Sequence, residues 1–148
     1  MSTDAAVTKD LMQILEDGKE GFHKAAEKLE STDRADLAVH FRRFGDERAR
    51  FYEELQGLAA SYGDGISESG SVVGTLHRTW MSLKDALAGS DPHGVLDAAE
   101  QGEDHAVATF EKALTEDISG PLRTVVERQY AAVKAAHDEV RSLRNATA

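Results

Sequence analysis

The sequence predicts an all-α protein with one domain over residues 1–148, built as two antiparallel helical hairpins. Three observations predict this fold class. Long segments place apolar residues at alternating spacings of three and four, which is the period of an amphipathic helix. Glycine, serine, aspartate and proline gather between these segments, and the whole chain has only two prolines. A chain of 148 residues is also long enough to bury a sizeable core.

The first hairpin joins two long helices through a short turn. The first helix runs from about Asp4 to Leu29, and the second follows the Ser31-Thr32-Asp33 turn and continues to about Tyr62. Side chains of this turn are candidates to cap the second helix. The residues predicted to face inward are Val7, Leu11, Ile14, Gly18, Phe22, Ala25 and Leu29 in the first helix, and Leu37, Phe41, Phe44, Arg48, Phe51, Leu55, Leu58 and Tyr62 in the second.

A glycine- and serine-rich loop over about residues 63–71 follows, and it is the longest loop signal in the chain. Residues 72–88 then form a shorter amphipathic helix whose apolar face includes Trp80. Gly89 and Ser90 end this helix. The sequence therefore predicts a short helix inside the connection between the two hairpins.

The second hairpin begins at Asp91-Pro92, a capping residue followed by proline at the first helical position. Ser119-Gly120-Pro121 repeats this signal and starts the last helix. The residues predicted to face inward are Leu96, Ala99, Glu103, Ala106, Phe110 and Ala113, and then Leu122, Val126, Gln129, Val133, Ala136, Val140 and Leu143.

The order of these segments predicts a ferritin-like four-helix bundle. Tight turns make each hairpin antiparallel, and the shorter helix at 72–88 can return along the bundle before the second hairpin begins. One long crossover of this kind is typical of ferritin-like folds. Simple up-and-down topology is the alternative, but it does not explain why the connection would contain a helix at 72–88.

Three polar residues interrupt the apolar stripes near the middle of their helices, namely Arg48, Glu103 and Gln129. Each has apolar neighbours three or four residues away on both sides, so all three face inward at one level of the bundle. A buried charge costs several kcal/mol unless it is paired. We therefore expect a buried network in which Arg48 pairs with Glu103 and Gln129 satisfies the remaining donors and acceptors.

Two glycines of the first helix, Gly18 and Gly21, lie at the same level. Glycine within a helix is up to about 1 kcal/mol less favourable than alanine. We therefore expect a bulky neighbour, either the Arg48 guanidinium or an aromatic ring, to need the room. The alternative is a small apolar ligand bound between helices, and the residues expected to line its pocket are Gly18, Gly21, His77 and Trp80.

A site for iron or another divalent metal ion is the alternative to the buried network. Its ligands would be Glu103, Glu100, Glu47 and His137. An arginine in such a site repels cations and itself satisfies a carboxylate, so we expect no metal cofactor. Glu47 would also need a helix distortion, such as a π-bulge, to face inward.

Composition excludes several classes of function. A net charge of −10 argues against binding to nucleic acids or anionic membranes. The absence of cysteine excludes disulfides, thiolate metal sites and cysteine nucleophiles. No apolar stretch has the length of a membrane span, and the opening MSTDAAVTKD lacks the pattern of a signal peptide. We therefore expect a cytoplasmic protein.

Several short motifs resemble one bacterial family. They are Asp17-Gly18 with Gly21-Phe22 and Ala25-Ala26, His77-Arg78 with Trp80-Met81, Glu100-Gln101-Gly102-Glu103-Asp104, and Gln129 with His137-Asp138. Together they make the chain similar to the PA2169-type four-helix-bundle proteins (DUF2383) of the ferritin-like superfamily. The resemblance covers nearly the whole chain. It implies a ferritin-like fold and an association with bacterial stress responses, without an established activity.

Di-iron members of that superfamily, such as rubrerythrins, carry a glutamate on each of two helices and Glu-x-x-His on the other two. In this chain Gly18 and Gly21 stand at the inward positions of the first helix, while Glu47-Arg48-Ala49-Arg50 and Glu127-Arg128-Gln129-Tyr130 lack the histidine. The comparison implies a non-catalytic bundle with a structural or binding role. A divergent di-metal binding or oxidase protein is the alternative. A homodimer is the assembly we consider, and the sequence identifies no protein or small-molecule partner.

Overall fold

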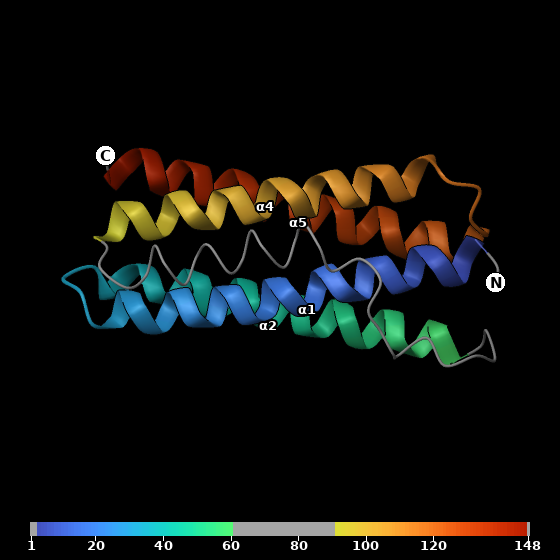
Figure 1. The fold of residues 1–148 in the computed structure, drawn as a ribbon, viewed down its shortest axis with the longest axis horizontal. Coiled ribbons are helices and arrows are strands. Elements are labelled where there is room, and N and C mark those ends of the chain that lie inside the picture. The colour runs from blue at the N-terminus through green and yellow to red at the C-terminus, as the bar shows by residue number, and fades with distance from the viewer. Residues whose placement is uncertain (1–2, 61–90, 148) are drawn as a thin grey trace.

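A computed structural model describes residues 3–60 and 91–147 of the chain (Figure 1). Within these two ranges the chain forms four long α-helices and no strand. The helices are α1 (Thr3–Glu30), α2 (Ala35–Ala59), α4 (Pro92–Thr115) and α5 (Gly120–Thr147). The predicted all-α class is confirmed, and the predicted helices differ from these by a few residues at their ends. The predicted loop at 63–71 and short helix at 72–88 lie outside the described residues.

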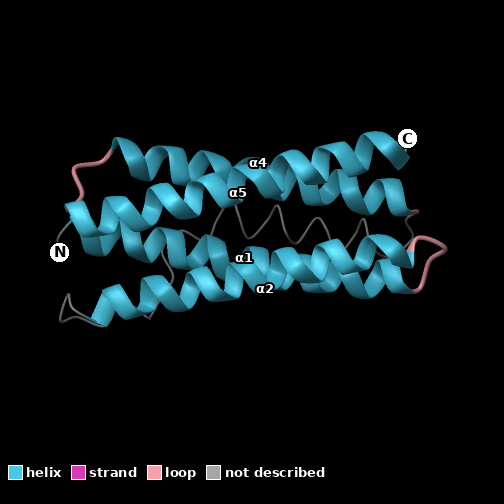
Figure 2. Ribbon diagram, turned by 180° about the vertical axis from the view of Figure 1, so that it is seen from behind, coloured by secondary structure: helices cyan, strands magenta, loops and turns pink. Residues whose placement is uncertain are grey.

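The helices form two antiparallel hairpins that lie side by side (Figures 1 and 2). α1 packs closely along α2 and α4 along α5, and α1 also lies against α4. α2 and α5 approach each other less closely. α2 ends at the opposite end of the bundle from the start of α4, so these two helices run in the same direction (Figure 1). No described helix combines the length and the apolar character that crossing a bilayer requires.

The start of α4 follows the sequence prediction. The Asp91 side chain accepts a hydrogen bond from the Gly94 N–H at 2.9 Å, and Pro92 occupies the first helical position. Both features suit a helix N-terminus, since the first N–H groups have no partner within the helix and proline has no N–H to satisfy.

The turn between α1 and α2 differs in part from the prediction. The hydroxyls of Ser31 and Thr32 donate to the carbonyls of Lys28 and Leu29, at 2.8 and 2.7 Å. The N-cap residue of α2, Arg34, makes no side-chain capping bond. A hydroxyl is a donor as well as an acceptor, so it can satisfy the free carbonyls at a helix C-terminus. These side chains therefore mainly close α1, and the Thr32 hydroxyl also accepts a hydrogen bond from the N–H of Arg34, the N-cap residue of α2, at 3.1 Å.

The apolar core is divided into two clusters along the bundle. The cluster nearer the start of α1 includes Leu11, Ile14, Leu15, Leu55, Phe110, Leu122, Val126 and Val133. The cluster nearer the start of α2 includes Phe22, Leu29, Leu37, Phe41, Phe44, Leu96 and Val140. Full burial of each large apolar side chain is worth about 1.5–3 kcal/mol, so these two clusters supply most of the driving force for folding.

The residues between the two clusters are small or polar. α1 contributes Gly18 there, α2 contributes Arg48 and α4 contributes Gly102 and Glu103, and all four are buried. A polar layer thus crosses the interior about halfway along the helices, between the two apolar clusters.

Candidate functional site

The polar layer is built on a buried ion pair. Arg48 of α2 donates through Nη1 to Oε1 of Glu103 of α4 at 2.7 Å, and through Nη2 to Oε2 at 2.6 Å. The two side chains are only 1% and 0% exposed. A bidentate arginine–carboxylate contact is among the strongest hydrogen-bonded pairs in proteins, because both partners are ionised and their geometries match.

Arg48 fills the space around the pair. Its guanidinium lies over the Phe22 ring, with Cζ 5.2 Å from the ring centre. A Cβ atom added at Gly18 would lie 3.1 Å from Nη1. The bulky neighbour predicted for this glycine is therefore the guanidinium. Among the described residues, no partner accepts a hydrogen bond from Nε of Arg48.

Gln129 does not join the ion pair, which corrects the predicted three-residue network. Its amide nitrogen donates to Oε1 of Glu54 at 2.8 Å and to the carbonyl of Phe51 at 3.3 Å. Glu54 also accepts a hydrogen bond from Arg128. Burial raises the pKa of the Glu54 carboxyl, but the hydrogen bonds from Arg128 and Gln129 outweigh burial and hold the pKa below its usual range. Gln129 thus belongs to a separate contact between α2 and α5.

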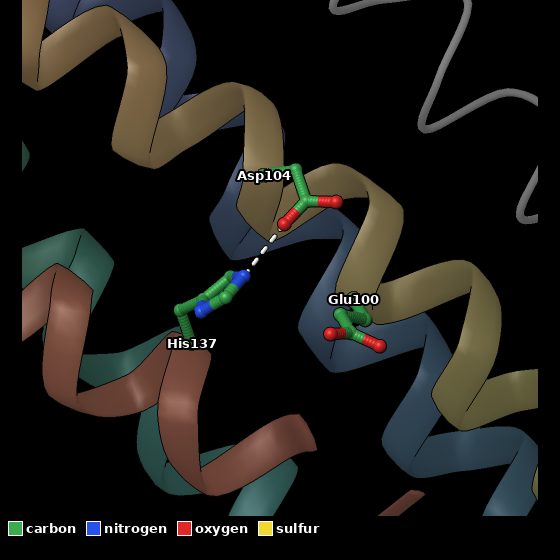
Figure 3. Close-up of side chains that lie close together, drawn as sticks. All are labelled: Glu100, Asp104 and His137. Atoms are coloured by element: carbon green, nitrogen blue, oxygen red, sulfur yellow. Dashed lines mark hydrogen bonds and ion pairs between the residues drawn. The ribbon is translucent and has the colours of Figure 1, made fainter.

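A second polar cluster lies at the border of the layer, between α4 and α5. Glu100 and Asp104 of α4 and His137 of α5 each present one ligand atom, and these atoms lie within 4.8 Å of one another. Figure 3 shows His137 pointing across to Asp104. Nε2 of His137 lies 2.6 Å from Oδ1 of Asp104. The Glu100 and His137 side chains are 8% and 6% exposed, whereas that of Asp104 is 59% exposed.

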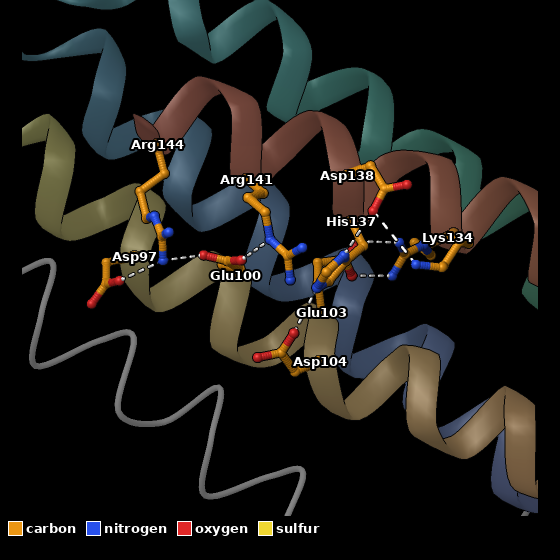
Figure 4. A network of polar contacts seen from close by, with 10 residues as sticks. Asp97, Glu100, Glu103, Asp104, Lys134, His137, Asp138, Arg141 and Arg144 are labelled. Atoms are coloured by element: carbon orange, nitrogen blue, oxygen red, sulfur yellow. Dashed lines mark hydrogen bonds and ion pairs between the residues drawn. The ribbon is translucent and has the colours of Figure 1, made fainter. Parts of the chain in front are cut away.

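Charged side chains of α5 surround this cluster (Figure 4). Nε of Arg141 donates to Oε2 of Glu100 at 2.8 Å, and Arg144 forms an ion pair with Oε1 of Glu100. Nδ1 of His137 lies 3.3 Å from Oδ1 of Asp138. The hydrogen bond with His137, aided by the nearby Lys134 ammonium, lowers the pKa of the Asp138 carboxyl below its usual value.

The metal ligands considered from sequence are therefore divided by the structure. Glu100 and His137 lie together, as that set required. Glu103 is instead held by Arg48, and Glu47, half-buried on α2, does not belong to the cluster. Arg48 contacts both oxygens of Glu103, and the inner face of α2 carries Arg48 in place of Glu47, so the structure does not bring these two glutamates to Glu100 and His137.

Sequence reasoning missed Asp104 of this border cluster and the two arginines that contact Glu100. Asp104 follows Glu100 by four residues, and Arg141 and Arg144 follow His137 by four and seven. Residues at such spacings share one face of a helix. These spacings were visible in the sequence, but the residues lie beside the apolar stripes of α4 and α5, whereas the prediction considered only the centres of the stripes.

The ligand pocket considered near Gly18, Gly21, His77 and Trp80 falls partly outside the described residues. Arg48 occupies the space beside Gly18, and residues 77 and 80 lie outside the described ranges. A pocket of about 380 Å³ opens between the first turns of α1 and the last turns of α4. Its lining residues are Thr3, Ala6, Val7, Asp10, Leu11, Thr109, Lys112, Ala113 and Glu116.

Comparison with known proteins places the chain in a family. A family model for a domain of unknown function (DUF2383) matches residues 5–116, which span α1 to the end of α4. The chain belongs to the DUF2383 family. The match contains both partners of the buried ion pair and two of the three residues of the border cluster, Glu100 and Asp104. A search of curated proteins gives no match.

Proposed function

We propose that this DUF2383 protein is a non-catalytic bundle of the ferritin-like type with a structural or binding role. The observation that carries the proposal is the bidentate Arg48–Glu103 ion pair, which is buried halfway along the bundle. In di-iron bundles this interior position holds inward carboxylates and histidines that bind the metal ions.

The residues at this level do not suit a di-iron centre. Both Glu103 oxygens accept hydrogen bonds from Arg48, and both side chains of this pair are buried, so neither can move aside to admit a metal ion. The guanidinium brings a fixed positive charge that opposes two divalent cations. Gly18, which faces this charge from α1, offers no side chain as a ligand.

The direction of the helices supports the ferritin-like assignment. α2 ends at the opposite end of the bundle from the start of α4 (Figure 1). Parallel α2 and α4, each the partner in an antiparallel hairpin, are the arrangement found in ferritin-like folds with one long crossover.

The structural role that we propose for the pair is to fix how the two hairpins meet. A buried ion pair adds little net stability relative to well-packed apolar residues, but one partner without the other is strongly unfavourable. Arg48 and Glu103 stand on different hairpins, so any shift of α2 along α4 would leave both charges buried and unpaired.

Anaerobic titration with ferrous iron, followed by exposure to oxygen, tests this proposal. We expect no binding of two ferrous ions per chain and no oxidation of iron faster than in buffer. Glu103→Gln, which keeps the size of the side chain, is the comparison variant, and circular dichroism verifies its fold. Two bound ions with rapid oxygen consumption, both lost in Glu103→Gln, would overturn the proposal. A single ion whose binding survives Glu103→Gln would support it, because Glu103 is then not a ligand.

A further inference from the structure

The border cluster on α4 and α5 combines the donor types of a metal site outside the interior pair. Glu100, Asp104 and His137 bring two carboxylate oxygens and one imidazole nitrogen to within 4.8 Å of one another. We propose that these three side chains bind one divalent transition-metal ion, of the zinc(II) or iron(II) class. This inference goes beyond the proposed function, because it uses neither Arg48 nor Glu103.

His137 is oriented for this purpose by a group outside the three ligands. Its side chain is 6% exposed, with Nδ1 facing Asp138 and Nε2 facing Asp104 (Figures 3 and 4). An ionised carboxylate only accepts hydrogen bonds, so the 2.6 Å contact with Asp104 places a proton on Nε2. A metal ion would replace this proton, and the N–H of Nδ1 would then be donated to the Asp138 carboxylate. Metal-binding histidines in proteins are commonly held by such an outer carboxylate, which sets the tautomer and the ring orientation.

Glu100 is oriented in the same way from the other side. It is 8% exposed, and Arg141 and Arg144 contact its two oxygens (Figure 4). An ionised carboxylate has about four acceptor positions, and the Arg141 and Arg144 side chains are 52% and 30% exposed, so they can shift while Glu100 keeps a position for a metal ion. Both buried ligands thus have an outer partner.

The geometry is close to what a small divalent ion requires. Bonds of about 2.0–2.2 Å in a tetrahedral site place ligand atoms roughly 3.3–3.6 Å apart. The present contact between Nε2 of His137 and Oδ1 of Asp104 is 2.6 Å, and all three ligand atoms lie within 4.8 Å. Shifts of about 1 Å therefore suffice, and the 59% exposed Asp104 can make them while water fills the remaining positions.

The donor set also selects the kind of ion. Imidazole nitrogen suits zinc, iron, copper and nickel, whereas magnesium and calcium prefer sites made of oxygen alone. The chain has no thiolate to favour softer ions, since it lacks cysteine. We therefore expect zinc(II) to bind in the presence of a large excess of magnesium.

Calorimetric titration of the chelator-treated full chain with zinc(II) tests the site. We expect one ion per chain and a rise in the unfolding temperature, because the ion binds only the folded protein. Asp104→Asn removes a ligand at an exposed position and should weaken zinc binding by about 100-fold or more. Asp138→Asn keeps all three ligands and should weaken it by about 10-fold, as is typical for an outer partner of a ligating histidine.

Asp46→Asn is the matched control. Asp46 is similarly exposed and contacts Nε2 of His23 at 3.0 Å, but this pair is not part of any three-ligand group among the described residues. Its zinc affinity should equal that of the wild type. Absence of saturable zinc binding in the wild type would overturn the proposal. Equal binding by the wild type and Asp104→Asn would also overturn it, and would show that zinc binds elsewhere on the surface.

Discussion

The Arg48 guanidinium lies directly against the backbone of Gly18, so close that a Cβ atom on this glycine would be 3.1 Å from Nη1. The contact explains why a helix of 28 residues carries glycine at an inward position, where alanine would favour the helix. Gly18, Phe22 and Glu103 together enclose a charged side chain that is 1% exposed. The interior of this bundle is therefore shaped around one arginine.

The first prediction concerns the ion pair. Glu103→Ala should lower the free energy of unfolding by about 3–5 kcal/mol, because it leaves the Arg48 charge buried without a partner. The double variant Arg48→Met, Glu103→Leu removes both charges and should be neutral or more stable by about 1–4 kcal/mol. Urea unfolding followed by circular dichroism measures both. If the double variant is as unstable as Glu103→Ala, the pair does more than neutralise two buried charges.

The second prediction compares two glycines. Gly18→Ala should destabilise the protein by about 1–3 kcal/mol, because the added methyl group overpacks a space filled by Arg48. Gly57→Ala on α2 should stabilise it by up to about 1 kcal/mol, because no neighbouring atom of the described chain lies within 4 Å of the added atom and alanine favours the helix. Thermal unfolding of the two variants gives the comparison. Equal effects at both positions would mean that Arg48 moves away from the added methyl group without a loss of stability.

A third prediction concerns the acid dependence of stability and follows from Glu54. Its pKa is lowered in the folded protein from an ordinary value of 4.5, mainly by Arg128 and Gln129 acting against burial. A depressed pKa means that the ionised form is stabilised by folding. Its contribution is therefore present above about pH 4.5 and is lost as the pH falls through the folded pKa. Glu54→Gln should be less stable than the wild type at pH 7, and the difference should vanish in acid.

Unfolding curves from pH 7 to pH 3 measure this difference. Glu111→Gln is a suitable control, since Glu111 is exposed and accepts a hydrogen bond from the Tyr130 hydroxyl of α5. Its stability relative to the wild type should change little over the same range. A gap between Glu54→Gln and the wild type that persists at pH 3 would contradict the assignment of the acid dependence to this carboxylate.

The fourth prediction has the opposite sign and concerns the pocket between α1 and α4. Burial raises the pKa of Asp10 above 3.8, and the opposing attraction of Lys112 and Lys9 does not cancel it. A raised pKa means that ionisation destabilises the folded state, so this contribution to stability is lost as the pH rises through the folded pKa. Asp10→Asn should therefore be slightly more stable than the wild type at pH 7, by about 0.5 kcal/mol, as for other surface substitutions.

The same pH series checks this prediction, since the gain from Asp10→Asn should shrink below about pH 4, where the wild-type carboxyl is protonated in both states. Asp36→Asn gives the contrast. Its hydrogen bond with Arg34 lowers the pKa of Asp36, so this substitution should not stabilise the protein at pH 7. A loss of stability in Asp10→Asn at pH 7 would mean that the attraction of Lys112 outweighs burial.

The sequence alone was informative about which side chains face the interior, because this depends on the periodicity of a single helix. Arg48 and Glu103 interrupt regular apolar stripes, so their inward direction follows from helical periodicity, and burial then requires them to meet. The room left by Gly18 followed from the same reasoning. These expectations depended on the spacing within single helices and on a charge rule that holds in any fold.

The tertiary structure decided which side chains meet where several partners compete. Gln129 faces inward as expected, but α5 sits so that its amide reaches Glu54 and not the ion pair. Likewise, Asp104 lies beside the apolar stripe of α4 and joins His137 only because the two helices pack at this rotation. A difference of a few ångströms in position along or around a helix exchanges one hydrogen-bond partner for another, and periodicity does not encode it. The sequence by itself thus determined the four described helices, their inner faces and the buried pair, whereas the packing of α4 on α5 decided the border cluster.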